Sequence, residues 1–317
     1  MIDITLQNFE SELIQGSSQL PVLLDIWAPW CGPCRTLGPM LERLEIAYAG
    51  RFRLAKLDSD AVPEIAAQLS QMFGVRSIPF CVMFVGGQPV DGFVGAVPEA
   101  QIREFLDKHV PSGEALEAAE EVAEAEVLLD EGDVEAALER LQQAVETDPA
   151  NELARFDLVR TLLEMGLLAQ AQAAFAPVAA RAADKITPHA RFAALGHWLT
   201  ACDRAAAGLD EAQLRSAINA NKRDFDSRFA LAQSHLARLD FTAAMDELLD
   251  IIMRDKAWNG ELARKTYVAI LELMTKPAPK AQAAEAKGTL EIAGRAIVTP
   301  NDPLLDQYRR KLSMALF

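Results

Sequence analysis

The chain has 317 residues, which is long enough for two hydrophobic cores, one of about 110 residues and one of about 200. Its formal net charge is −15, and no segment is basic enough to predict binding to nucleic acid. The chain has four cysteines, and its first residues, Met1–Thr5, lack the basic and apolar parts of a signal peptide. We therefore expect a protein of a reducing compartment, the cytoplasm, that does not bind a membrane.

The most informative segment is Trp30–Cys34, which reads Trp-Cys-Gly-Pro-Cys. It follows an apolar, strand-like run, Val22–Ile26, and precedes a helix-like one. Two cysteines separated by two residues at a strand-to-helix turn form a dithiol with redox chemistry available to it. The free amides at a helix N-terminus stabilise a thiolate, which is the nucleophilic form of cysteine.

Two other interpretations of Cys31 and Cys34 are open. A zinc site needs four ligands, usually from a second Cys or His pair, but Cys81 and Cys202 are isolated and the four histidines form no such pair. A permanent structural disulfide is the other alternative, although in a reducing compartment such a pair is more often catalytic or metal-binding. The sequence favours a catalytic dithiol, and we expect neither a metal nor a cofactor.

The elements after this motif are predicted in a characteristic order. They are a helix containing Pro39, a buried strand at Ala55–Asp58, a strand at Phe80–Val85 preceded by Ile78 and Pro79, a hairpin turn at Gly86–Gly87, and an amphipathic helix at Gln101–His109. This order and spacing resemble a thioredoxin over residues 1–110. The resemblance implies an α/β thioredoxin fold for this domain and thiol–disulfide oxidoreductase activity.

The resemblance also implies roles for the residues of the motif. Cys31 corresponds to the attacking cysteine, exposed at the start of the helix, and Cys34 to the buried resolving cysteine. The Cys31 thiolate is expected to attack a substrate disulfide, and Cys34 is expected to displace the reduced product from the mixed disulfide. Gly32 and Pro33 form the intervening pair of reducing thioredoxins, so a reductant is expected rather than an oxidant.

Two charged residues complete the expected catalytic set. Asp25 resembles the buried carboxylate that handles the Cys34 proton, and burial raises a carboxyl pKa toward the neutral range. An ordinary aspartate at a strand end is the alternative. Lys56 resembles the lysine neighbour of that carboxylate across the sheet, with a solvated surface charge as its alternative.

The expected substrate contacts lie around the motif. Pro79 resembles the cis-proline that faces the active site, which would let the backbone of Ile78 pair with an extended substrate segment. Trp30 is expected to be an exposed apolar contact. Phe80 and Cys81 depart from the family, which commonly has a threonine and an aliphatic residue there. Phe80 is therefore a candidate to alter the substrate groove. Cys81 is expected to lie in the core, and a redox partnership between Cys81 and the active site is the alternative.

The composition changes after residue 110. Residues 111–125 are predicted as an acidic linker and the start of a helix, and residues 111–152 carry fourteen acidic residues and one base, Arg140. We interpret this charge as a solvated helix face. A docking strip for a basic partner is the open alternative.

Internal repeats follow in the second part of the chain. Gly132 and Gly166 lie in similar contexts 34 residues apart, which is the tetratricopeptide period. A later copy around Phe229 matches the segment around Phe156 at a distance of 73 residues. Residues 126–317 are therefore predicted to form an all-α tetratricopeptide-like helical repeat domain, and such arrays bind peptides or partner proteins in their grooves.

A last helix is predicted over residues 304–317, basic in its middle and apolar at its end. Its candidate partner contacts are Tyr308, Arg309, Arg310, Leu312 and Phe317. The helix is interpreted either as a docking helix for the apolar groove of a partner or as a cap on the repeat array.

A thioredoxin domain, helical repeats and such a tail together resemble the chaperedoxin family. This resemblance implies a cytoplasmic protein that holds unfolded or oxidised client proteins, protects their cysteines and passes them to a GroEL-type chaperonin through the C-terminal helix. Thioredoxin reductase as a partner follows only by analogy. The alternative is a thioredoxin-like reductase that the repeats direct to one specific partner complex, without general holdase activity.

Overall fold

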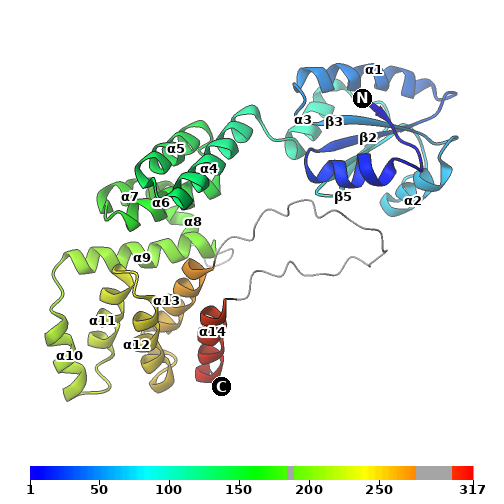
Figure 1. Ribbon diagram of the computed structural model, residues 1–317. Coiled ribbons are helices and arrows are strands. Elements are labelled where there is room, and N and C mark those ends of the chain that lie inside the picture. Colours follow the sequence, from blue (N-terminus) through cyan, green and yellow to red (C-terminus); the bar gives the residue numbers. More distant parts are fainter. Residues whose placement is uncertain (184–188, 276–301, 317) are drawn as a thin grey trace. The chain divides into compact units, whose positions relative to one another are not determined.

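The computed structural model describes residues 1–183, 189–275 and 302–316, which belong to two compact units, Met1–Glu120 and Glu121–Phe317 (Figure 1). The division falls within helix α4 (Gly113–Glu131). The boundaries predicted at residues 110 and 125 lie on either side of this division and stay predictions. Each unit is described by itself below.

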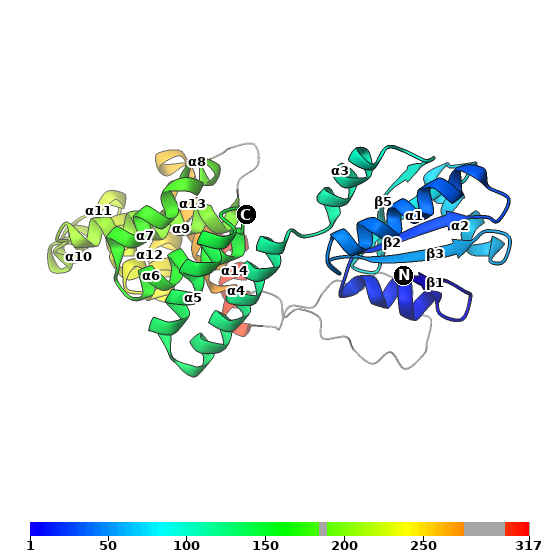
Figure 2. The ribbon, with the colours of Figure 1, turned by 90° about the horizontal axis from the view of Figure 1, so that it is seen from above.

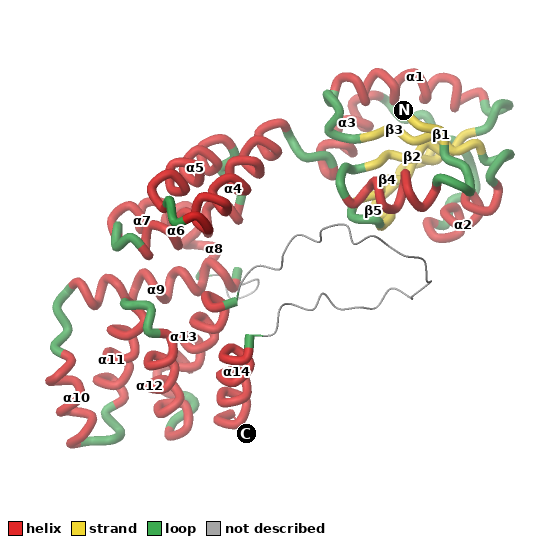
Figure 3. Tube along the Cα trace, in the orientation of Figure 1, coloured by secondary structure: helices red, strands yellow, loops and turns green. Residues whose placement is uncertain are grey.

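The first unit is built on one five-stranded sheet with the strand order β1-β3-β2-β4-β5 (Figure 3). The strands are β1 (Ile2–Asp3), β2 (Val22–Trp27), β3 (Arg53–Asp58), β4 (Phe80–Val85) and β5 (Gln88–Val94). β1, β3 and β2 are parallel, whereas β4 runs antiparallel to β2 and to β5. The predicted α/β class of this unit is confirmed.

Helices cover both faces of the sheet. Alternate side chains of a strand point to opposite faces, and in β2 both sets are buried. Leu24 and its neighbours on one face pack against η1 (Phe9–Gln15) and α2 (Pro63–Phe73). Leu23 on the other face packs against α1 (Gly32–Ala47) and α3 (Glu99–His109). Asp25 shares the face of Leu23, so its carboxylate lies in the layer that contains α1.

Three glycines set the geometry of the β4–β5 hairpin. Gly86 and Gly87 both have positive φ, 61° and 80°, as the predicted two-residue turn requires. Gly92 lies farther along β5, where a Cβ atom would come within 2.7 Å of the Cys81 carbonyl oxygen. Only glycine therefore lets β5 approach β4 this closely beside Cys81.

Within the described ranges the second unit contains only helices, so its predicted all-α class is confirmed (Figure 2). After α4, the described helices are α5 (Val134–Thr147), α6 (Glu152–Glu164), α7 (Leu168–Phe175), η3 (Ala176–Val178), α8 (Ala179–Ala182), α9 (Ala190–Ala206), α10 (Glu211–Ala220), α11 (Phe225–Ala237), α12 (Phe241–Arg254), α13 (Trp258–Met274) and α14 (Pro303–Leu316). Five of them begin at an Asp or Asn whose side chain accepts the amide three residues on: Asp133, Asn151, Asp210, Asp224 and Asp240. These N-caps define where consecutive helices of the array start.

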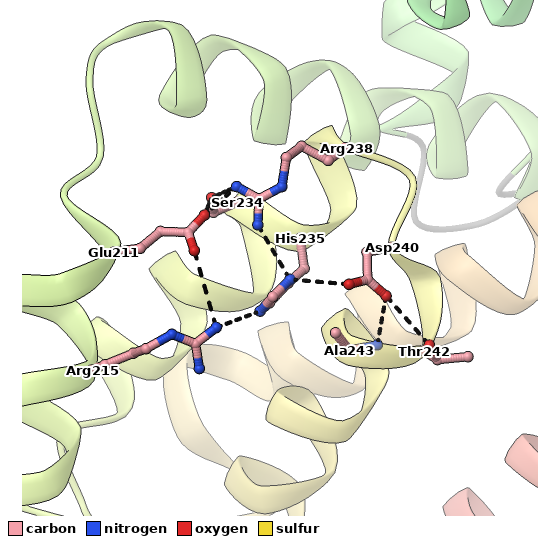
Figure 4. Close-up of polar contacts among 8 residues, drawn as sticks. All are labelled: Glu211, Arg215, Ser234, His235, Arg238, Asp240, Thr242 and Ala243. Atoms are coloured by element: carbon pink, nitrogen blue, oxygen red, sulfur yellow. Dashed lines mark hydrogen bonds and ion pairs between the residues drawn. The ribbon is translucent and has the colours of Figure 1, made fainter.

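A polar network joins three consecutive helices of this array, α10, α11 and α12 (Figure 4). Glu211 of α10 accepts hydrogen bonds from Ser234 of α11 and from Arg238, the C-cap of α11. The bond from Arg238 is the main reason that the pKa of Glu211 is lowered to about 2. Nδ1 of the buried His235 lies 3.5 Å from Oδ2 of Asp240, which is also the N-cap of α12. Since both acids are paired with residues of the neighbouring helices, we assign the network a structural role.

None of the described helices is both long and apolar enough to cross a membrane.

Candidate active site

The two cysteines of the motif lie where β2 gives way to α1. Cys31 is the N-cap of α1, and a disulfide joins it to Cys34 in the first turn, with 5.4 Å between the two Cα atoms. The backbone amide of Cys34 donates a hydrogen bond to the Cys31 Sγ, 3.3 Å away. An amide donor and a helix N-terminus both stabilise negative charge on this sulfur. The geometry therefore favours Cys31 as the thiolate, in keeping with its expected role as the attacking cysteine.

The expectation that Cys31 is exposed is wrong for this disulfide form. Cys31 is 4% exposed and Cys34 is 5% exposed, so burial does not distinguish them. Both pack with Ala28, and the partly buried Trp27 and Ile78 cover them. Cys31 is covered because it is joined to Cys34 and packs with Ala28, Trp27 and Ile78.

Asp25 is buried in the sheet beneath α1, as expected. It is 1% exposed, and its register partners are Lys56 on β3 and Cys81 on β4. Burial raises the pKa of Asp25 to about 6, against the lowering effects of the Lys56 charge and the Cys81 hydrogen bond. A carboxyl with this pKa exchanges protons readily near neutral pH.

Lys56 is half-buried and paired, not a solvated surface charge. Its Nζ lies 2.6 Å from Oε1 of Glu42 on α1, and its side chain is 18% exposed. Its ammonium group lies over Gly38, where a Cβ atom would be in van der Waals contact with Nζ at 3.4 Å. Sequence reasoning missed Glu42. The available signal is its position four residues after Gly38, which places both residues on one face of the helix.

The expected substrate contacts lie on the accessible side of the motif. Trp30 is 69% exposed, and its Nε1 donates to Asp60 Oδ2 at 2.9 Å. A Cβ atom at Gly32 would have no neighbour within 4 Å, and Pro33 lies in the first turn of α1.

The expected cis bond is present between Ile78 and Pro79. The Pro79 carbonyl accepts from the amide of Gly95, 2.8 Å away. Within the described ranges, no backbone hydrogen bond involves Ile78, so its main-chain groups are available to pair with a substrate strand.

Phe80 and Cys81 are the two residues that depart from the family pattern, and the structure bears out the expectation only for Cys81. Phe80 is 1% exposed and packs edge-on against Phe73, with ring centroids 5.6 Å apart. The expectation that it alters the substrate groove is therefore wrong, since its side chain points into the core toward α2. Cys81 lies in the core as expected, but its Sγ also contacts Asp25 Oδ1 at 3.8 Å, which sequence reasoning missed.

The C-terminal helix α14 packs on its own array. Leu305, Tyr308 and Leu312 form its buried face, and the Tyr267 hydroxyl of α13 donates to the Tyr308 carbonyl at 2.8 Å. Tyr308 and Leu312 are therefore not direct partner contacts in the docked helix, which corrects their predicted role. The sequence pattern of an apolar helix face is the same whether that face packs on the chain's own array or on a partner.

The remaining candidate residues of this helix differ in exposure. Arg309 and Arg310 are exposed, and Met314 is 80% exposed. Phe317 lies outside the described residues. The outward face that a partner could reach therefore includes the two arginines, Met314 and Leu304, which is 41% exposed.

Along the parts of the chain that the structure describes, no three His, Cys, Asp or Glu side chains are grouped as metal ligands. The site instead presents a disulfide at a helix N-terminus, with a buried carboxyl of raised pKa in the adjoining strand. These features define a thiol–disulfide oxidoreductase.

Comparison with known proteins gives the family. Residues 1–108 match the family model described as Thioredoxin, and residues 128–195 and 204–287 match models described as Tetratricopeptide repeat. Thioredoxin 1 of Nostoc sp. is 41% identical over 107 residues, which is 34% of this chain and 94% of the relative. Thioredoxin of Synechocystis sp. is 45% identical over 93 residues, which is 29% of this chain and 83% of the relative. The chain belongs to the thioredoxin family, to which it adds a tetratricopeptide region.

Proposed function

We propose that this protein is a cytoplasmic chaperedoxin, which holds unfolding or oxidised client proteins and reduces their disulfides. The observation that carries the proposal is the union in one chain of a Cys31–Cys34 exchange site and a tetratricopeptide array. Such arrays bind polypeptides along their surfaces. A client held by the array would then remain available to the cysteine pair of the same molecule.

In the proposed reaction the reduced protein acts as a two-electron donor. The Cys31 thiolate attacks one sulfur of a client disulfide, and the other client sulfur leaves as a thiolate. Asp25 accepts the Cys34 proton, and the Cys34 thiolate attacks Cys31 Sγ. The client is released with both sulfurs reduced, and Cys31 and Cys34 become the disulfide seen here.

The charges around Asp25 suit this proton transfer. Asp25 is ionised at neutral pH, because its pKa of about 6 is raised yet remains below 7. Lys56 favours the ionised form, although Glu42 competes for the same ammonium group. Trp30 and the free backbone of Ile78 would hold the client beside Cys31. Thioredoxin reductase is the proposed source of electrons for the next cycle.

The array offers an accessible surface for clients. A groove of about 780 Å³ lies along α9 and α13 and is lined by alanines and by charged residues, among them Glu261, Arg264 and Lys265. Val268 of α13 lines it and is 48% exposed. The small alanine side chains in this lining leave room for the bulky apolar groups of a partially unfolded protein.

The holdase activity should survive removal of the redox chemistry. The full chain carrying Cys31→Ser and Cys34→Ser is expected to suppress aggregation of heat-denatured citrate synthase as well as the unaltered chain, measured by light scattering. Val268→Asp is expected to weaken the suppression severalfold, since a charge would stand in the groove.

Val90→Asp is the matched control, because Val90 is also 48% exposed but lies on β5 of the first unit. Equal suppression by the Val268 and Val90 variants would reject the groove as the client surface. An unaltered chain that fails to suppress aggregation would reject the holdase function itself.

Transfer to a GroEL-type chaperonin is proposed to use the outward face of α14. Met314→Asp is expected to weaken co-elution of the full chain with a GroEL-type chaperonin by about tenfold, since an exposed apolar anchor is lost. Met165→Asp, at a 37% exposed methionine after α6, should have no effect. If both variants co-elute like the unaltered chain, α14 does not carry the contact.

A further inference from the structure

We propose that Cys81 is a positioning residue for disulfide exchange, whose thiol donates to the Asp25 carboxylate and holds it in place for proton transfer. The inference rests on the proton-acceptor role proposed above for Asp25. It concerns a position at which this chain departs from the common thioredoxin pattern, where an aliphatic side chain has no hydrogen to donate.

The geometry places the two side chains opposite one another. Cys81 on β4 is the antiparallel register partner of Asp25 on β2, and both share the sheet face that α1 covers. The Cys81 Sγ lies 3.8 Å from Asp25 Oδ1, and the residues are 0% and 1% exposed. A weak S–H donor gains strength in such a water-poor, low-dielectric setting.

The Cys81 thiol keeps its proton at neutral pH. Burial, and next the charge of Asp25, raises the pKa of Cys81 well above the ordinary value. The protonated thiol donates to the ionised Asp25 carboxylate, and an S–H donor favours that form of the carboxyl group.

The other charged groups around Asp25 only partly compensate its buried charge, so the Cys81 donor has a stabilising role. From β3, Lys56 faces Asp25, but its ammonium group is also bound by Glu42 of α1 at 2.6 Å. Glu42 opposes ionisation of Asp25 by its own charge. The Cys31–Cys34 pair at the start of α1 carries no charge in the disulfide form. Cys81 is thus the donor on the β4 side, and it offsets part of the cost of burying the carboxylate.

Cys81→Val should remove the donor while nearly conserving volume. The midpoint of Asp25 ionisation is then expected to rise, and the resolution step at pH 7 to slow by about threefold to tenfold. The first readout is the NMR chemical shift of the Asp25 carboxyl carbon, which is measured as a function of pH in the oxidised full chain. The second readout is the pH profile of resolution of a preformed mixed disulfide.

Three further variants sharpen the test. Cys81→Ser restores a hydrogen-bond donor. The midpoint of Asp25 ionisation and the midpoint of the pH–rate profile for resolution should then return to, or fall below, those of the unaltered chain. Met83→Leu alters the same face of β4 without touching Asp25 and should move neither midpoint. Cys81→Ala serves if the valine variant folds poorly. An Asp25 midpoint that is the same in Cys81→Val and the unaltered chain would overturn the hydrogen bond, and an unmoved rate profile would overturn the positioning role.

The premise is tested separately with Asp25→Asn. If that variant keeps the same pH midpoint for resolution, Asp25 is not the proton acceptor, whatever the Cys81 variants show.

Discussion

Asp25→Asn is expected to make the first unit more stable at pH 8 by about 3 kcal/mol while slowing disulfide exchange. The pKa of Asp25 is raised by burial from 3.8 to about 6 in the folded protein. Between these two values the unfolded chain has lost a proton that the folded chain retains, so stability falls as pH rises through this range. Above pH 6 the loss of folding stability is complete. Below pH 4 both states are protonated, and the penalty is absent.

Asparagine cannot ionise, so the variant should escape this loss. The comparison is made by hydrogen exchange of core amides in β2 and β4 of the oxidised full chain, because exchange reports on the first unit alone. Unaltered and variant chains should converge near pH 4 and separate at pH 8. Asp3→Asn, an exposed residue of the same sheet, is the control and should behave like the unaltered chain. The same pH dependence in Asp25→Asn and the unaltered chain would contradict the assignment.

The second large effect concerns the nucleophile. Cys31→Ser should lower the rate of insulin disulfide reduction by roughly a thousandfold or more, because the attacking thiolate is absent. Turnover is measured by insulin precipitation with dithiothreitol as the electron source. Cys202→Ser, in α9, should leave the rate unchanged. Substantial turnover by the Cys31 variant would remove this residue from the attacking role.

Cys34→Ser should behave differently from Cys31→Ser. With no resolving thiol, the mixed disulfide at Cys31 accumulates, and its protein partners are then identified by mass spectrometry. A broad set of adducts after oxidative stress would support the chaperedoxin. Adducts confined to one native complex would instead identify a reductase directed to a single partner.

Local patterns in the sequence predict most of the first unit. Continuous apolar runs, the Gly86–Gly87 turn and the proline after Ile78 are set by neighbouring residues, so the central strands and the hairpin turn follow from the sequence. The contacts of Glu42 with Lys56 and of Cys81 with Asp25 do not. They depend on the pairing of strands and on the rotation of α1 over the sheet, which are fixed by tertiary packing.

The C-terminal helix α14 is a second case in which the sequence predicts an element but not its packing. Its amphipathic pattern predicts the helix, and the structure has it at Pro303–Leu316. The pattern does not say which surface receives the apolar stripe. The structure buries Tyr308 and Leu312 in the array, because α12 and α13 present a matching apolar face.

The burial of the remaining cysteines makes the redox state of this protein directly readable. Cys81 is wholly enclosed, and burial raises the pKa of the half-buried Cys202 to about 11, so neither carries an appreciable thiolate fraction at neutral pH. Brief alkylation of the native chain should then tag only the cysteines of the motif, and only after their disulfide is opened. A maleimide gel shift would therefore report the fraction of oxidised molecules in an intact cell extract.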